Sequence, residues 1–344
     1  MRWMNEDDGA VSVVVAISLM VLAGMAALTL DVGNLYWERR QLQAGADAAA
    51  LAAAQDLVDG AGDAAAESSA RAYTSENNVR DAHMDDITRP TESSVRVETV
   101  TGDMASQGVI ESLLASVIGT DDYFARAEAT AAWGGIGTGI TIPIALCEHA
   151  WNHFTDDGAI LPSGPPAHIL RVGVPPGHVN EDVDCSNPGG GDPPPGGFGF
   201  LDANGDCLAV VDANNWMDGS NGNNPDIGGS QPCATDDFYE MLFDVVNDNG
   251  TVLIPIFDEF DGQGSSGKYH IIGFGGFLLQ GYSINAGPQP SNKAHGRVYQ
   301  WSGSCPGSAS CLRGYFTEFV ALDGEFPAGG GGDEFGATLI RLIG

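Results

Sequence analysis

The strongest hydrophobic pattern in the chain is an uninterrupted apolar run near its start. Residues 10–30 carry no charged side chain, and most of them are apolar. At about 1.5 Å of rise per residue, a helix of this length spans roughly 31 Å, the thickness of a bilayer core. A cleaved secretory signal would need a basic start and a shorter apolar region. Residues 1–9 instead contain three acidic residues and only one basic residue, Arg2. We therefore predict a retained transmembrane helix.

The helical pattern continues beyond the apolar run. Residues 31–57 contain no proline and are rich in helix formers. Apolar residues recur every seven positions on one stripe, and the small ones would allow another helix or a sheet to approach closely. We therefore predict one helix over 10–57, whose extracytoplasmic part is Ala-rich and packs through Leu35, Leu42, Ala46, Ala49 and Ala53.

Residues 58–134 have the pattern of a small α/β neck. Apolar and polar residues alternate over 92–100 and again over 123–133, the period of half-buried strands. Between them, residues 105–118 have the spacing of a short helix. A strand–helix–strand unit packed against the long helix would bury all three apolar faces.

Residues 135–344 contain short apolar runs separated by clusters of turn-forming residues. Only 10 of the 66 glycines and prolines precede residue 134, so the composition changes sharply at 133–135. This pattern predicts a loop-rich antiparallel β domain, either a sandwich or a barrel-like sheet. The whole chain is then of the α+β class, with candidate strands at 207–212, 251–257, 269–280, 298–301 and 315–322.

Charge and cysteine usage restrict the partners and the compartment. The formal net charge is −32, so nucleic acid is excluded as a partner by repulsion. An even set of cysteines confined to one loop-rich domain favours disulfides and an oxidising compartment. Proximity suggests the pairs Cys305–Cys311 and Cys207–Cys233, which would leave Cys147–Cys185, although six cysteines allow 15 pairings.

The orientation of the helix follows from the cysteines more than from the basic residues. Arg2 precedes the apolar run, whereas Arg39 and Arg40 follow it. The positive-inside rule therefore weakly disfavours a cytoplasmic amino terminus. Because the cysteines favour an oxidising compartment, we expect a single-pass cell-membrane protein. Its amino terminus, 1–9, would be cytoplasmic, and its domain 135–344 would be extracellular.

The first 57 residues resemble a known family. Residues 9–11 lead into the hydrophobic run, and the motifs at 31–33, 39–43 and 46–52 follow in order. This arrangement resembles the TadE/TadG-like region of Flp (tight adherence) pilus-assembly proteins. The resemblance implies a membrane-anchored component that assembles or anchors a pilus through contacts with pilus-assembly or pilin-like proteins and the bilayer.

One departure separates the chain from the pilin-like members of that family. Those members keep a glycine at the cleavage site and a glutamate at the fifth mature position, whereas Gly9 here is followed by Ala10 and the fifth position is Val14. The resemblance therefore favours a permanently anchored, TadG-like component. Short motifs at 195–202, 254–258 and 269–274 also resemble the carboxy-terminal domains of actinobacterial TadG-related proteins.

Three motifs could suggest ligand chemistry. Asp202, Asn204 and Asp206 occupy positions one, three and five of a calcium loop, but Cys207 replaces its glycine and Ala213 its bidentate acid. A turn is the simpler interpretation, so these three remain weak metal candidates. His149 and His153 lack a third ligand. Residues 262–268 have phosphate-loop spacing without the final Ser or Thr.

The sequence accordingly predicts no catalytic residues, no cofactor and no small-molecule substrate, and thus a protein that is not an enzyme. An alternative function is a surface-displayed binding module that holds calcium or glycans with the acidic loops between 202 and 226.

Overall fold

The computed structural model places the chain in two compact units. It describes residues 7–77, 82–101, 125–161, 168–172, 198–203, 208–220, 236–262, 267–283, 298–300, 310–322 and 330–343. The first unit comprises Met1–Ala132 with Arg341–Gly344, and the second comprises Trp133–Ile340. Each unit has its own secondary structure and its own core.

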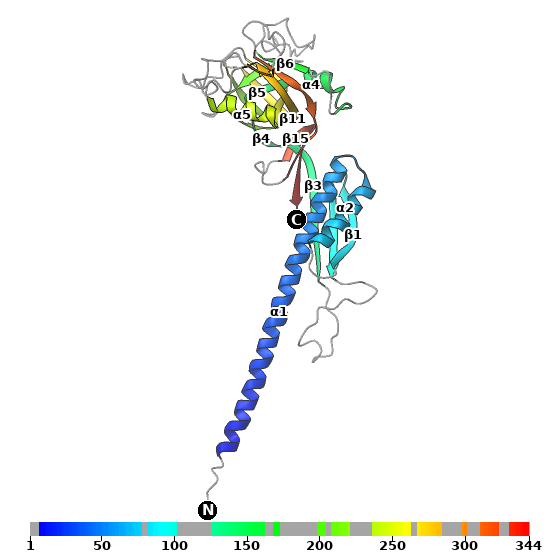
Figure 1. Cartoon of the computed structure of the whole chain (residues 1–344), viewed down its shortest axis with the longest axis vertical. Coiled ribbons are helices and arrows are strands. Elements are labelled where there is room, and N and C mark those ends of the chain that lie inside the picture. The colour runs from blue at the N-terminus through cyan, green and yellow to red at the C-terminus, as the bar shows by residue number, and fades with distance from the viewer. Residues whose placement is uncertain are drawn as a thin grey trace, which may run out of the picture. The chain divides into compact units, whose positions relative to one another are not determined.

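The first unit is organised by one long helix, α1 (Asp7–Val58), of 52 residues (Figure 1). The helix runs without interruption because no proline interrupts it and alanine dominates its second half. It ends at a turn in which Gly60 takes a positive φ of 72°. A second helix, α2 (Asp63–Glu76), then packs against α1 and buries Ala66, Ala70 and Thr74 along one face.

Three antiparallel strands complete the first unit: β1 (Ala82–Thr91), β2 (Ser94–Thr101) and the first part of β3 (Arg126–Ile136). The central strand is β2, in which Val97 lies opposite Ile87 on one side and Ala129 on the other. The strands predicted at 92–100 and 123–133 are therefore confirmed as β2 and β3. The helix predicted at 105–118 lies outside the described residues, and α2 and β1 were not predicted.

The second unit is built around one long strand, β11 (Lys268–Ser283). Along one edge it pairs with β10 (Thr251–Asp261). Its other partners are β9 (Asn215–Ser220), β15 (Gly330–Phe335), β13 (Ser310–Thr317) and the short β12 (Val298–Tyr299). The strand thus organises most of the pairing in this unit.

Five strands close into a ring. β10 pairs with β5 (Ile144–Cys147), β5 with β7 (Phe198–Leu201), and β7 with β9. Because β9 also pairs with β11, the ring returns to its starting strand and leaves no open edge between these members. The β-rich character predicted for the domain is therefore confirmed, and of the two predicted forms the ring is nearer to a barrel-like sheet than to a sandwich.

The remaining elements of the second unit lie around this ring. β13 pairs with β6 (His168–Val172), and two further pairs, β4–β8 and β14–β16, are not members of the ring. The remaining bounds are β4 (Thr138–Thr141), β8 (Ala209–Asp212), β14 (Phe319–Leu322), β16 (Ala337–Ile343), α4 (Glu148–Thr155) and α5 (Asp236–Asn247).

Two details of the predicted β domain are wrong. The pairs β5–β10, β11–β15 and β14–β16 are parallel, so the sheet is mixed and not purely antiparallel. Two helices, α4 and α5, also interrupt the strands. A short apolar run does not reveal the direction of its partner strand, because strand direction depends on how distant segments connect.

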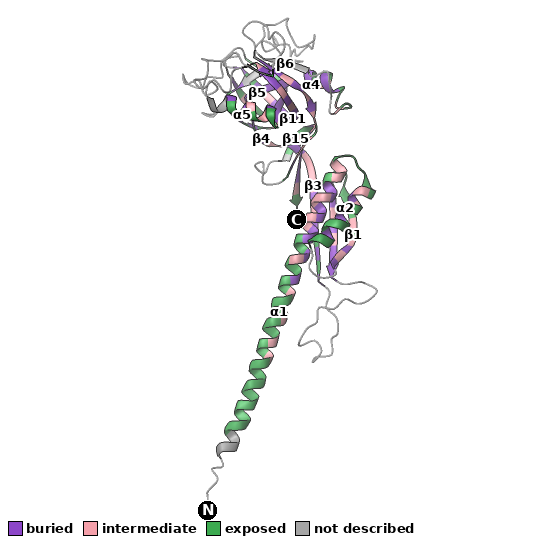
Figure 2. Ribbon diagram, viewed as in Figure 1, coloured by how far each residue is buried: buried purple, intermediate pink, exposed green. Residues whose placement is uncertain are grey.

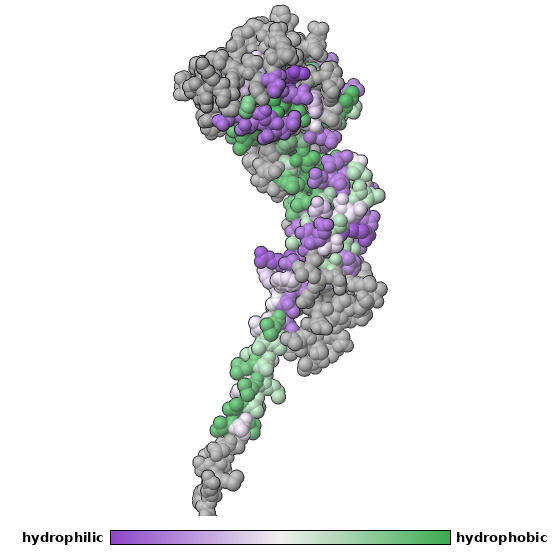
Figure 3. Space-filling view, viewed as in Figure 1, coloured by the Kyte–Doolittle hydropathy of each residue, from purple (hydrophilic) through white to green (hydrophobic). Residues whose placement is uncertain are grey.

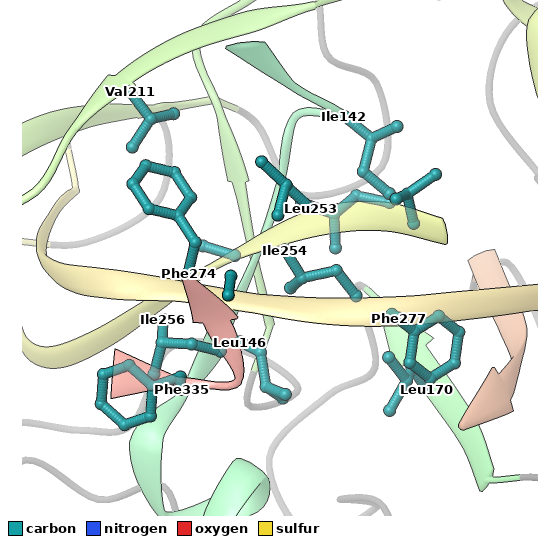
Figure 4. Packing of buried hydrophobic residues seen from close by; sticks show 14 of the residues in the cluster. Ile142, Leu146, Leu170, Val211, Leu253, Ile254, Ile256, Phe274, Phe277 and Phe335 are labelled. Carbon is teal, nitrogen blue, oxygen red and sulfur yellow. The ribbon is translucent and has the colours of Figure 1, made fainter. Parts of the chain in front are cut away.

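The core of the second unit lies along the middle of β11, where both faces of the strand are buried (Figure 4). Phe274 and Phe277 are fully buried, and Phe277 meets Phe316 edge-on with ring centroids 5.2 Å apart. Gly273, on the face opposite to that of Phe274, has no side chain, which leaves room for the ring of Phe335. A strand with glycine at this position can therefore carry packed layers on both faces.

We expect Gly273→Ala to destabilise the second unit by about 1–3 kcal/mol, because the added Cβ would lie 2.8 Å from the Phe335 ring and would overlap the Asp333 carbonyl oxygen. The matched control is Gly134→Ala, whose Cβ would meet nothing within 4 Å. Chemical unfolding of the full chain in detergent measures both. Equal unfolding midpoints for the two variants would contradict this packing.

Burial of a tyrosine also makes the stability of this core depend on pH in the alkaline range. The ring of Tyr269 is 6% exposed, and desolvation raises the pKa of its hydroxyl from 10.0 to about 12. Since the folded-state pKa lies above the unfolded value, the associated stability is complete below pH 10 and is lost as the pH rises to 12. We expect roughly 2–3 kcal/mol of such loss, absent in Tyr269→Phe and retained in a Tyr73→Phe control, as measured by urea unfolding at pH 9 and pH 11.5.

Candidate membrane anchor and helix-packing site

The first half of α1 is an apolar surface that nothing in the described structure covers. The large apolar side chains between Val11 and Val32 are all more than half exposed or close to it (Figures 2 and 3). Within the described residues this is the helix that is long and apolar enough to cross a membrane. Exposure of so much contiguous apolar surface is typical of a segment that lies in lipid.

The second half of α1 is buried against its own unit. The residues that the sequence predicts for packing follow this division: Leu42, Ala46, Ala49 and Ala53 are fully buried, whereas Leu35 is only partly so. The buried face is also wider than predicted, because Ala50 and Ala54 join it. These side chains lie against α2 and β2, and alanine permits the close approach of both backbones.

Hydrogen bonds add direction to this packing. The Thr99 hydroxyl of β2 donates to the Leu42 carbonyl oxygen at 3.2 Å inside the interface. The Gln43 side-chain amide donates to the Glu128 carbonyl oxygen of β3 at 3.0 Å and to the Asp47 carboxylate at 2.8 Å. Helix α1 is therefore tied to two strands of the sheet at a defined register along its axis.

A cleft of about 500 Å³ lies beside these bonds within the first unit. It combines charged groups with apolar ones, and Arg96 and Glu128 face each other across 3.8 Å. Its lining residues are Gln43, Asp47, Arg96, Glu128, Ala129, Thr130, Leu342 and Ile343. The last two are the partly exposed end of β16, so the cleft joins the carboxy-terminal end of the chain to the packed half of α1.

Residues 9–56 match the model of a family described as "Putative Flp pilus-assembly TadE/G-like". No curated protein and no solved structure matches the chain. The matched TadE/G-like region coincides with α1 from its first turn almost to its end. It thus includes both the uncovered apolar half of the helix and the half that packs against α2 and β2.

The described structure includes only one of the three weak metal candidates. Asp202 is exposed beside β7, whereas Asn204 and Asp206 lie outside the described residues. His149 and His153 are exposed on α4. Across the parts of the chain that the structure describes, no three metal-ligating side chains cluster. No observation therefore favours the calcium- or glycan-binding alternative at these residues.

The structure describes two of the six cysteines, Cys147 on β5 and Cys311 on β13. Both are buried, and neither is a free thiol. The partners that proximity suggests for them, Cys185 and Cys305, lie outside the described residues. The disulfides and their pairing stay a prediction, as they do for Cys207 and Cys233.

Sequence reasoning missed one cluster of polar side chains on the ring. His270 on β11 lies opposite Trp216 on β9, with ring centroids 5.3 Å apart, and its Nδ1 is 2.7 Å from the Asp258 carboxylate on β10. The neighbouring Lys268 forms a 3.0 Å ion pair with Asp218. These residues come together only through strand register, so no spacing in the sequence could have revealed them.

The packing face can be tested by volume alone. We expect Ala49→Leu to destabilise the first unit by about 1–3 kcal/mol, because the buried face has no room for a larger side chain. Ala44→Leu is the matched control, since Ala44 is exposed on the same helix and leucine is also a good helix former. Thermal unfolding of the full chain in detergent, with limited proteolysis near Gly60, compares the two, and a tolerated Ala49→Leu would show that the face is not tightly packed.

Proposed function

We propose that this protein is a membrane-anchored, extracytoplasmic component that assembles or anchors a Flp/Tad-type pilus through protein–protein contacts, without catalysis. The observation that carries the proposal is that the TadE/G-like match coincides with one helix whose two halves have different surroundings. Residues 9–56 match the family, and the helix they form is uncovered and apolar in its first half and buried in its second.

The two halves suggest a mechanical role for the helix. About 20 residues suffice to cross a bilayer, and the buried face begins at Glu38, roughly 12 Å beyond the end of the apolar run. Because the helix has no break between these segments, a load on the folded part would pass directly into the membrane-spanning part. An anchor needs this property, whereas a secreted binding module does not.

We further propose the orientation and the type of component. The amino terminus would be cytoplasmic and the second unit extracellular, where an oxidising compartment would allow the six cysteines to pair. Val14 at the position of the pilin glutamate supports a permanently anchored, TadG-related component over a processed pilus subunit. The partners would be pilin-like or pilus-assembly proteins, which the β-rich second unit would contact.

The test is cell fractionation of the full chain, with protease added outside intact cells and with amino-terminal sequencing of the recovered protein. We expect a membrane-bound protein that resists carbonate extraction, keeps its first residues and loses its second unit to external protease. Leu19→Arg should weaken membrane insertion, because a central arginine costs about 3 kcal/mol there, whereas Ala44→Arg outside the span should not.

The other outcomes identify different functions. A new amino terminus at Ala10 would mean pilin-like processing and make the protein a pilus subunit. Release as a soluble protein cut within the apolar run would contradict the anchor and favour a secreted module. A strain that lacks the protein and still forms normal pili would contradict the pilus role alone.

A further inference from the structure

The helix α1 has two different faces at the level where its apolar half ends. Tyr36 and Trp37 are 71% and 41% exposed, and Arg39 and Arg40 are exposed beside them. At 3.6 residues per turn, Tyr36, Trp37 and Arg40 share one side of the helix, and Arg39 lies at the edge of that side. Leu35, Glu38 and Leu42 fall on the opposite side, where Glu38 and Leu42 are buried.

The two arginines differ in their pairing from other arginines of the same unit. Within the described residues no carboxylate lies at ion-pair distance from Arg39 or Arg40. Of the nearby acids, Glu38 is buried on another side of the helix, and Asp47, two turns beyond Arg40, accepts a 2.8 Å hydrogen bond from the Gln43 amide. Four other arginines each have a carboxylate partner, in the pairs Arg71–Glu67 at 2.6 Å, Arg89–Asp63 at 3.4 Å, Arg96–Glu128 at 3.8 Å and Arg126–Asp85 at 3.6 Å.

The position of these cations matches the headgroup layer of a bilayer. Tyr36 lies about 9 Å and Arg40 about 15 Å beyond Leu30, the last residue of the apolar run, at the helical rise per residue. Side chains on a helix tilt toward its amino terminus, which for α1 is the direction of the apolar half. Long arginine side chains would therefore reach back to the lipid phosphates while the aromatic rings lie at the interface.

We propose that Tyr36, Trp37, Arg39 and Arg40 form a binding face for the phosphate headgroups of anionic phospholipids. This inference rests on the proposed membrane anchor and names a lipid partner for it. In a chain of net charge −32, an unpaired pair of guanidinium groups next to the span offsets the repulsion between the acidic protein and an anionic surface. Each guanidinium can also bind a phosphate through two parallel hydrogen bonds.

The experiment uses the full chain in a neutral maltoside detergent, supplied with equal amounts of phosphatidylglycerol and phosphatidylcholine. Native mass spectrometry then measures the ratio of the two lipids that remain bound. We expect the wild type to favour phosphatidylglycerol and the Arg39→Gln/Arg40→Gln variant to lose about tenfold or more of that preference. Arg39→Lys/Arg40→Lys should keep most of it, because the charge remains.

A matched control separates local binding from net charge. Arg71→Gln/Arg89→Gln removes the same two charges from the same unit but at residues that already pair with carboxylates, and it should keep the preference. An equal loss in this control, or no preference in the wild type, would overturn the inference. Fractionation of the same variants distinguishes the two proposals, since a membrane-bound wild type without lipid preference leaves the anchor intact.

Discussion

The close packing of alanine against two neighbours is the interaction on which the first unit depends. Ala46, Ala49 and Ala53 on α1 leave no exposed surface, and the backbones of α2 and β2 come near enough for the Thr99 hydroxyl to reach a helix carbonyl. Any larger side chain at these positions would push the helix away from the sheet. The packing therefore determines where the buried part of the helix begins. The part of the helix before that point remains available to lipid.

Electrostatics divides the same helix in a second way. The apolar half tolerates no charge in a bilayer, so the first exposed cations occur beyond it, at Arg39 and Arg40. The acid that precedes them, Glu38, lies instead on the packed side of the helix and is only 3% exposed. One uninterrupted element thus combines an uncovered apolar surface, a pair of exposed cations and a buried surface packed against α2 and β2.

The second unit solves a different problem, which is how to build a core from a chain rich in glycine and proline. Its long central strand β11 pairs along both edges and is buried on both faces. Several short strands are therefore held in the sheet by their pairing with β11. Closure of the ring through β5, β7 and β9 removes the free edges that would otherwise invite pairing with other chains. The result is a β-rich core in which glycine-containing strands are held by their pairing with β11 and with the members of the ring.

The sequence alone was sufficient for the long helix, its apolar span and the β-rich character of the distal part, because these depend on local composition and period. It also placed Leu42 and the alanines on one stripe, since helical spacing is set by the backbone. Tertiary structure alone decided the parallel pairing of β5 with β10, the closure of the ring and the meeting of His270 with Trp216 and Asp258. These features join residues that are distant in sequence, and which strands pair depends on the free energy of the whole core and on no pattern within a single segment.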